Sequence, residues 1–415
     1  MKNIVFKTSF VILLTIPFLL LSCSKESEET LPLDPVSIGL TTEQILLIES
    51  ENTFAFDFFE NVLEQSEESE NIIISPLSVT YALSMTLNGA DGATRDSMLK
   101  ALRVNGISPE EINNSYKNLS EALLNVDKRV LISIANSVWI EKYFVVKKSF
   151  TDILTESYNA ESKSFDITDP LAHEPMNTWI ETKTNGLIKN MIEQLDDNTV
   201  MLLINAIYYK GKWKSQFDKE NTVQQSFYKP GGITDDVPMM KQTSNFKFYD
   251  GDRFILAEFP YGQGNFVMDV ILPDDNNGLN DIIPLINENN FKGWLEQMGE
   301  REVNLTFPRF KYGYKKQLKD ILTDMGMGIA FIDGADFSNI SDLNLLINDV
   351  THQAFIETNE EGTEAAAATI VEIGLTSMPT TPLVLNIDHS FIYIIRETTT
   401  NTILFMGRVA DPLAG

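Results

Sequence analysis

The apolar run from Thr199 to Tyr209 limits most strictly how this chain can fold. It reads Thr-Val-Met-Leu-Leu-Ile-Asn-Ala-Ile-Tyr-Tyr and holds no charged residue. A strand with one wet face alternates apolar and polar residues, whereas a run that is apolar at almost every position predicts a strand covered on both faces. The fold is therefore expected to contain a sheet that lies between two layers of other elements.

The rest of the chain predicts an α+β domain with extensive sheet. Phe54, Phe58 and Leu63 recur near helical spacing in the first third, and Tyr81–Leu87 continues this pattern after Ser75-Pro76. From about Thr41 onward there is no low-complexity linker and no internal repeat, so we expect one large domain over residues 41–415. Further strands are expected at Val130–Ala135, Phe266–Leu272, Val303–Phe307, Ala354–Thr358, Val384–Ile387, Phe391–Arg396 and Leu404–Met406.

Residues 1–22 are expected to be a signal peptide and not part of the fold. Lys2 and Lys7 flank the start of an apolar run that is too short to cross a bilayer as a helix. Leu20-Leu21-Ser22-Cys23 follows and resembles the lipobox of bacterial lipoproteins, in which the cysteine is lipidated. The alternative is an ordinary secretory signal with an incidental cysteine. We favour the lipoprotein because Cys23 is the only cysteine of the chain.

Residues 23–40 are then expected to be an acidic tether behind a lipidated Cys23. Ser24–Glu29 resembles the stretch that sends some Gram-negative lipoproteins to the cell surface. We therefore expect an outer-membrane or cell-surface lipoprotein of a Gram-negative bacterium, exposed to the extracellular side. Its membrane contact would be the lipid anchor at Cys23.

The charge of the chain argues against a nucleic-acid partner. The formal net charge is −27, and without residues 1–22 the chain keeps 30 basic residues against 59 acidic ones. Such a surface repels phosphates. The simplest explanation of this net charge is that it keeps the protein soluble. We expect the protein to be a monomer.

Patterns of catalytic residues are weak. The three histidines, His173, His352 and His389, are too scattered for a zinc site of the usual spacing. The acid pairs Asp235-Asp236 and Asp274-Asp275 stand in Gly- and Asn-rich sequence and are interpreted as solvated turn residues. A Ser-His-Asp triad stays open, because its members need only meet in space. We expect no enzyme, no metal site and no cofactor.

The segment from Glu360 to Pro382 has the composition of a helix, a strand and a loop at once. Its alanines favour a helix, and its last residues are typical of an exposed loop. Read by alternation, one face from Thr363 to Leu375 carries no charge, and the other holds Glu364 and Glu372. This is the pattern of a strand with one buried face and one wet face.

Short sequence blocks follow one another over more than 330 residues of the mature chain. They are Asn71–Val79, Gly89–Thr94, Ile134–Trp139, Asn177–Trp179, Lys183–Gly186, Asn205–Trp213, Val237–Met240, Ala335–Ser338, Asn386–Ile392 and Phe405–Val409. In sequence and order these blocks resemble those of the serpin family of serine protease inhibitors. Near the C-terminus His389-Ser390 stands where the family more often has Arg-Pro.

This resemblance implies a fold of three β-sheets and about nine helices, with an exposed reactive-centre loop between Glu360 and about Pro382. It also implies a suicide-type inhibitor. A protease cleaves the loop and forms an acyl-enzyme, and the first half of the loop then inserts into the main sheet as a new strand. The target is dragged to the far end of the molecule. The alternative is a non-inhibitory serpin that acts as a surface binding or carrier lipoprotein.

The usual loop length of the family, counted from Glu360, places the reactive bond at Thr376–Ser377. Leu375–Thr376 and Met378–Pro379 compete with it. A small β-branched residue before the bond suits elastase-like serine proteases, and subtilisin-like or papain-like targets stay open. Trypsin-like enzymes are not expected, because no Lys or Arg lies between Glu360 and Ile395.

The resemblance assigns three further groups of residues, none of which makes or breaks bonds. The hinge is the start of the loop, the breach is where the loop enters the main sheet, and the shutter lies under the centre of that sheet. We expect an Arg309–Glu360 ion pair in the breach. The hinge consists of Glu360, Gly362, Thr363, Ala365, Ala366, Ala367 and Ala368; the breach of Trp213, Arg309 and Glu360; and the shutter of Ser75, Ser78, Asn205 and His352.

Overall fold

The strand expected from the long apolar run is β4, Met201–Lys212, and it is covered on both faces. Ile207 and Tyr209 point into the main hydrophobic core. Ile204 and Ala206 face the other way, into a smaller apolar cluster that also contains Met176 and Trp179 of helix α6, Glu174–Lys183. The alternation along β4 thus separates two apolar layers, as the sequence predicts.

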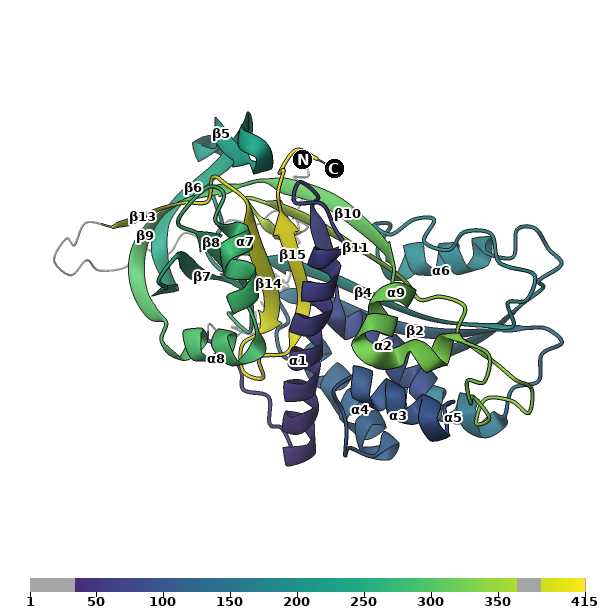
Figure 1. Ribbon diagram of the computed structural model, residues 1–415. Coiled ribbons are helices and arrows are strands. Elements are labelled where there is room, and N and C mark those ends of the chain that lie inside the picture. The colour runs from purple at the N-terminus through teal and green to yellow at the C-terminus, as the bar shows by residue number, and fades with distance from the viewer. Residues whose placement is uncertain (1–33, 364–381, 415) are drawn as a thin grey trace, which may run out of the picture. The chain divides into compact units, whose positions relative to one another are not determined.

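The computed structural model describes residues 34–363 and 382–414, all of which lie in one compact unit, Pro32–Gly415. Its six-stranded sheet contains β4 near the middle and has the order β10-β11-β12-β4-β2-β3 (Figure 1). The other strands of this sheet are β10 Phe310–Gln317, β11 Thr351–Asn359, β12 Gly362–Thr363, β2 Val130–Glu141 and β3 Glu161–Phe165.

The remaining strands form one nine-stranded hydrogen-bonded system. Strand β6, Ile233–Asp250, is long enough to pair with β5 and β9 and, at its end, with β7. Through these pairings β6 connects strands into one hydrogen-bonded system, whereas the fold expected from the family resemblance counts them as two separate sheets. The members beside β6 are β1 Ile72–Ile74, β5 Val223–Lys229, β7 Phe254–Tyr261, β8 Phe266–Pro273, β9 Gly299–Pro308, β13 Leu383–Asn386, β14 Phe391–Glu397 and β15 Ile403–Val409.

Nine α-helices lie within the part of the chain that the structure describes, so the expected α+β class is confirmed. Local sequence explains where the first two begin. Thr41 and Gln44 form a capping box at the start of α1, Thr42–Glu64. Ser75 caps α2, Pro76–Leu87, with Pro76 in its first turn. The others are α3 Gly92–Ala101, α4 Pro109–Asn125, α5 Lys148–Tyr158, α6, α7 Leu279–Ile282, α8 Glu288–Glu296 and α9 Lys319–Leu322.

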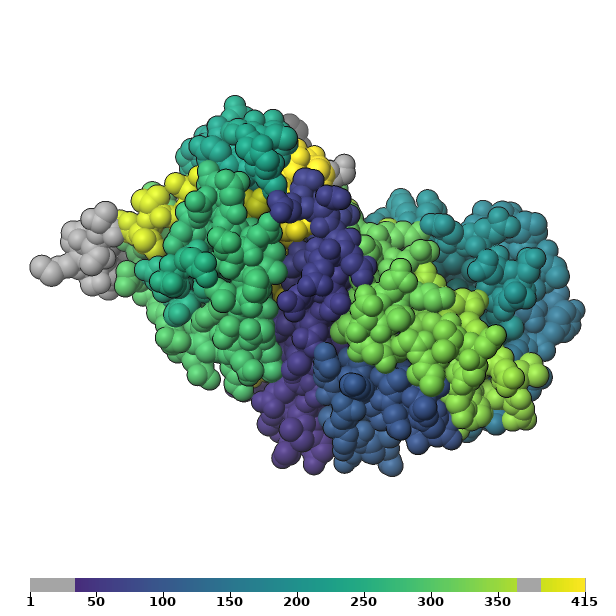
Figure 2. Space-filling model, viewed as in Figure 1, coloured from purple at the N-terminus to yellow at the C-terminus, as the bar shows by residue number. Residues whose placement is uncertain are grey.

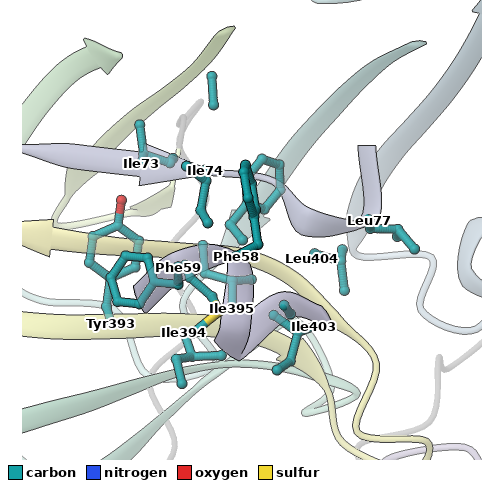
Figure 3. Packing of buried hydrophobic residues seen from close by; sticks show 14 of the residues in the cluster. Phe58, Phe59, Ile73, Ile74, Leu77, Tyr393, Ile394, Ile395, Ile403 and Leu404 are labelled. Atoms are coloured by element: carbon teal, nitrogen blue, oxygen red, sulfur yellow. The ribbon is translucent and has the colours of Figure 1, made fainter. Parts of the chain in front are cut away.

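Helix α1 and the C-terminal strands meet in the main core, although they lie at opposite ends of the chain. Figure 3 shows Phe58 and Phe59 of α1 beside Ile394 and Ile395 of β14. These side chains are at most 2% exposed. Burial of such residues contributes about 1.5–3 kcal/mol each. The C-terminal strands are therefore integral to the domain.

The structure corrects the interpretation of one acid pair and bears on the membrane question. Asp235 and Asp236 lie in β6 and not in a turn, because this stretch pairs with β5. Within residues 34–363 and 382–414, no helix is both long and apolar enough to cross a membrane.

Candidate functional site

The site expected at the start of the reactive loop is built on β12, which lies between two strands of the six-stranded sheet. Thr363 pairs with Thr358 of β11 and with Gly211 of β4, and both pairings are antiparallel. In the described part of the chain, β12 is the element that connects β11 to β4 in the sheet. Gly362 and Thr363 of the hinge thus already form a short strand between β11 and β4.

Gly362 occupies a position that a larger residue cannot take. Its φ is +143°, and a Cβ atom built on it would lie 2.1 Å from the carbonyl oxygen of Gly211. Glycine is the residue that tolerates both this backbone conformation and so close an approach of another strand. The function of Gly362 visible here is therefore close packing of β12 on β4.

Thr363 faces inward and is buried, as the alternation predicts. Its Oγ1 lies 2.8 Å from Oη of Tyr261, which ends β7. The Tyr261 ring in turn stacks on Trp213, with ring centroids 4.3 Å apart and planes 11° from parallel. The first inward loop residue therefore contacts an aromatic pair beneath the sheet.

Trp213 of the breach holds the chain at the start of the hinge. Its indole Nε1 donates to the carbonyl oxygen of Asn359 at 2.9 Å, and its backbone N–H donates to that of Glu361. The side chain is buried against Phe217 and Phe307. Trp213 thus fixes the turn between β11 and β12 at both ends.

The expected ion pair between Arg309 and Glu360 is present. Nε of Arg309 donates to Oε1 of Glu360 at 2.7 Å, and the hydroxyl of Thr222 donates to the same oxygen. Burial of the Glu360 carboxyl would raise its pKa, but the hydrogen bonds from Arg309 and Thr222 outweigh this and hold the pKa below its usual value. The carboxylate is therefore charged and paired at neutral pH.

The four shutter residues lie together between α2 and the sheet. Ser75 Oγ donates to the carbonyl oxygen of Leu404 at 2.8 Å, and the backbone N–H of Ser75 donates to Nε2 of His352 at 3.0 Å. Ser78 Oγ donates to Oδ1 of Asn205. Burial lowers the pKa of His352 to about 4, so its imidazole is neutral and can accept.

Small cavities follow the line between β4 and β11 below β12. One of about 20 Å³ is lined by Tyr209, Ile356 and Thr363 among others. A second of about 10 Å³ is lined by Asn205, His352 and the other two shutter residues. Each cavity has about the volume that one water molecule occupies, so the packing along this line is close except at these two points.

Three residues of the site were not predicted from the sequence: Thr222, Tyr261 and Asn136. Asn136 of β2 stands directly opposite Asn205 and accepts from its Nδ2 at 2.7 Å. A polar residue in each of two adjacent apolar strands was a usable signal for this pair. Thr222 and Tyr261 carry no such signal, because their partners lie more than a hundred residues away in the chain.

Several predicted residues lie outside the described residues. They are the reactive bond at Thr376 and Ser377, the alanines Ala365 to Ala368, and Cys23. Their assignments stay predictions, as do the roles of the hinge, breach and shutter in insertion.

Comparison with known sequences gives a consistent family. The family described as Serpin (serine protease inhibitor) matches residues 49–412. An uncharacterized serpin-like protein of Thermococcus kodakarensis is 32% identical over 399 residues, which cover 94% of this chain and 91% of that protein. Serpin B3 of Homo sapiens is 32% identical and covers 88% of this chain, and 99% of Serpin B3 is matched.

Solved structures agree with this result. The thermophilic serpin tengpin in its native state matches with a TM-score of 0.81 and 30% identity, over 91% of this chain and 96% of tengpin. Thyroxine-binding globulin in complex with thyroxine matches with a TM-score of 0.80 and 27% identity, over 88% of this chain and 99% of the globulin.

Proposed function

Because the chain belongs to the serpin family of serine protease inhibitors, we propose that it traps its target by inserting the cleaved reactive loop into the six-stranded sheet. Serpins in general act on proteases and are not themselves enzymes. The target attacks the bond between Thr376 and Ser377, and its nucleophile becomes acylated by the Thr376 carbonyl. The loop residues before the bond then enter between β11 and β4.

The observation that carries this proposal is β12 itself. Gly362 and Thr363 already hydrogen-bond to both neighbours, so insertion extends a strand that exists and needs no new nucleus. Each further residue adds ladder hydrogen bonds worth about 1 kcal/mol net. The small residues Ala365–Ala368 come next in the sequence and offer little steric resistance.

Charge placement supports the same proposal. If the alternation set by Thr363 continues, Glu364 and Glu372 stay on the wet face while the uncharged residues go under the sheet. A buried unpaired charge would instead cost several kcal/mol. The sequence from Thr363 to Thr376 spans roughly 45 Å when extended, enough to carry a bound protease along the sheet.

We propose elastase-like serine proteases as targets, with subtilisin-like and papain-like enzymes as further candidates. Thr376 is small and β-branched, and Leu375 precedes it. A shallow primary specificity pocket accepts such a residue, whereas the pocket of trypsin-like enzymes requires Lys or Arg.

The test is incubation of the mature protein with a panel of proteases, followed by denaturing gels and N-terminal sequencing of the released C-terminal peptide. The expected result is a covalent complex with an elastase and a peptide that begins at Ser377. A peptide that begins elsewhere refutes the bond assignment, and strong trapping of trypsin refutes the specificity.

One observation favours a second candidate, a surface binding or carrier protein. A cavity of about 360 Å³ lies between α1 and α8, lined by Phe56, Phe291 and Leu295 among others. Figure 2 shows α1 in purple running along the green surface that contains α8. Thyroxine-binding globulin, one of the structural neighbours, is named for a ligand that it binds. Cleavage without any covalent complex across the whole panel would favour this candidate.

We also propose that a lipid at Cys23 holds the inhibitor on the outer surface of a Gram-negative cell. The sequence Leu20–Cys23 and the acidic stretch after it support this location. The test is a Cys23→Ala variant, which is expected in the medium or the periplasm, while the wild-type protein stays in the membrane fraction and is accessible to added protease on whole cells.

A further inference from the structure

The end of the six-stranded sheet that lies farthest from the hinge can be located from the strand pairings. Strand β2 begins at Val130, which faces Gly211 next to β12. Ten residues later Ile140 faces Met201, the first residue of β4. At about 3.3 Å per residue the two ends of the sheet are roughly 33 Å apart. The turn after Glu141 therefore belongs to the far end.

This far end carries the most exposed large hydrophobic side chains of the described residues. Tyr143 is 79% exposed, Val145 78% and Leu343 63%. We call these three residues the far-end patch. A single exposed hydrophobic residue needs no explanation, but the gathering of the three most exposed ones at one end of one sheet points to an interaction surface.

The patch is held on fixed backbone. Phe144 and Val146 alternate with Tyr143 and Val145 and pack against the main core. The backbone N–H of Lys147 donates to the carbonyl oxygen of Ile340 at 2.7 Å. The Lys147 ammonium group pairs with Asp342, the neighbour of Leu343, also at 2.7 Å. The two segments therefore lie side by side, the second being part of the light green chain before β11 in Figure 1.

The pairing of β12 shows where an acylated protease would arrive, given the proposed function on which this inference rests. Thr363 faces Gly211, and each step along an inserted antiparallel strand moves one residue back along β4. Ile373 would then face Met201, and Thr376 would lie beyond the end of β4. On the other side, Ile370 would face Thr351, the first residue of β11.

The patch lies beside that arrival point. Strand β2, which ends two residues before Tyr143, is the second strand from the inserted one, about 10 Å away at the usual strand spacing. Leu343 lies next to this segment, because the neighbouring Asp342 pairs with Lys147. A protease attached through Thr376 is far wider than this distance, so it would reach the patch.

We propose that Tyr143, Val145 and Leu343 form a contact surface for the translocated acyl-protease and prolong the life of the trapped complex. Large aromatic and aliphatic side chains on rigid backbone are the kind of residue that supplies binding energy at protein interfaces. The patch meets the protease after insertion, so it acts on the lifetime of the complex. It has no part in recognition of the loop or in acylation.

The experiment compares a triple variant, Tyr143→Ser, Val145→Ser and Leu343→Ser, with wild type and with Leu131→Ser. Leu131 is a matched control, because it is 56% exposed on the same strand β2 but at the hinge end. The association rate, the stoichiometry of inhibition and the rate at which protease activity returns from the purified complex are measured for all three proteins.

The triple variant is expected to keep the association rate and stoichiometry and to release active protease at least about fivefold faster, which is the scale of losing one interface contact worth about 1 kcal/mol. The control is expected to behave like wild type. Equal release from all three proteins overturns the inference. A change in the oligomeric state of the free triple variant, with no change in release, also overturns it and assigns the patch to self-contact. Absence of any covalent complex with wild type overturns the proposed function itself.

Discussion

At the scale of single residues, Glu51 is a buried carboxyl that lies outside the hinge, breach and shutter. It lies in α1 and is 5% exposed. Its Oε1 accepts from Thr80, and its Oε2 has no hydrogen-bond partner among the described residues. Burial raises its pKa to about 7, although the hydrogen bond from Thr80 and the nearby hydroxyl of Tyr116 oppose this; the buried Tyr81 and Tyr158 of α2 and α5 are also near it.

A folded-state pKa above the ordinary value of 4.5 means that the folded protein holds the proton more tightly than the unfolded chain. The stabilisation is fully present below pH 4.5 and is lost as the pH rises through 7. The loss at pH 8 is about 3 kcal/mol. We expect Glu51→Gln to raise the urea midpoint at pH 8 and to change it little at pH 4.5. Glu60→Gln, at an exposed position of the same helix, is the control and is expected to leave the midpoint unchanged at both pH values.

His352 has the opposite dependence. Its folded-state pKa of about 4 lies below the ordinary value of 6.5, so the unfolded chain binds the proton more tightly. The penalty is absent above pH 6.5 and grows to about 3 kcal/mol as the pH falls to 4. Protonation also removes the acceptor for the N–H of Ser75.

We therefore expect the stability difference between wild type and His352→Gln to shift in favour of the variant between pH 6.5 and 4. Urea unfolding across this range measures it, with His173→Gln at the start of α6 as control. A constant difference between wild type and variant over the range would contradict the assignment of a neutral buried imidazole.

At this scale the family resemblance predicted which side chains meet. The Arg309–Glu360 pair and the grouping of Ser75, Ser78, Asn205 and His352 were expected from it, and the structure contains both contacts, while their roles in insertion stay predictions. Tyr261 and Thr222 could not be found in this way. Their partners are fixed by the meeting of distant strands, which no local pattern records.

At the scale of elements, the pairing of β12 sets the alternation on which the proposed insertion depends. Thr363→Arg would bury an unpaired cation at the position where Thr363 now contacts the Tyr261 hydroxyl, at a cost of several kcal/mol before relaxation. Even a rise of about 2.7 kcal/mol in the insertion barrier slows that step about a hundredfold. Hydrolysis of the acyl-enzyme should then win, and the inhibitor becomes a substrate cleaved at the same bond.

The ratio of covalent complex to cleaved protein on a denaturing gel measures this outcome. Glu364→Arg, one position along on the wet face of the alternation, is expected to keep trapping largely intact. Equal loss in both variants would show that alternation does not govern insertion. No loss in either would refute insertion of this strand.

Long apolar runs were the strongest sequence signal for strands. Both β4 and β8 are buried along most of their length, so composition alone reveals them. By contrast β6 was missed, because it is half exposed, contains Pro238 and carries acidic residues at its start. Its pairing with β5 and β9 overrides this weak local preference.

At the scale of the whole molecule, the proposed function implies that the native fold is metastable. A loop of some ten inserted residues adds about 10 kcal/mol of ladder hydrogen bonds and further apolar burial. We expect protein nicked at the reactive bond to unfold at a temperature higher by about 20 °C or more than intact protein. Circular dichroism melts before and after nicking measure this, and identical melts would refute insertion.

The two pairings of Thr363 also fix which of the following loop residues would face inward if the strand continued. A strand repeats every two residues, so deleting one residue between Thr363 and Thr376 would exchange the faces of everything downstream of the deletion. A deletion just after Glu364 would thus turn Glu372 into the sheet, whereas deletion of two alanines would leave the faces unchanged and shorten only the reach. Trapping is therefore expected to depend on the parity of a deletion more than on its size.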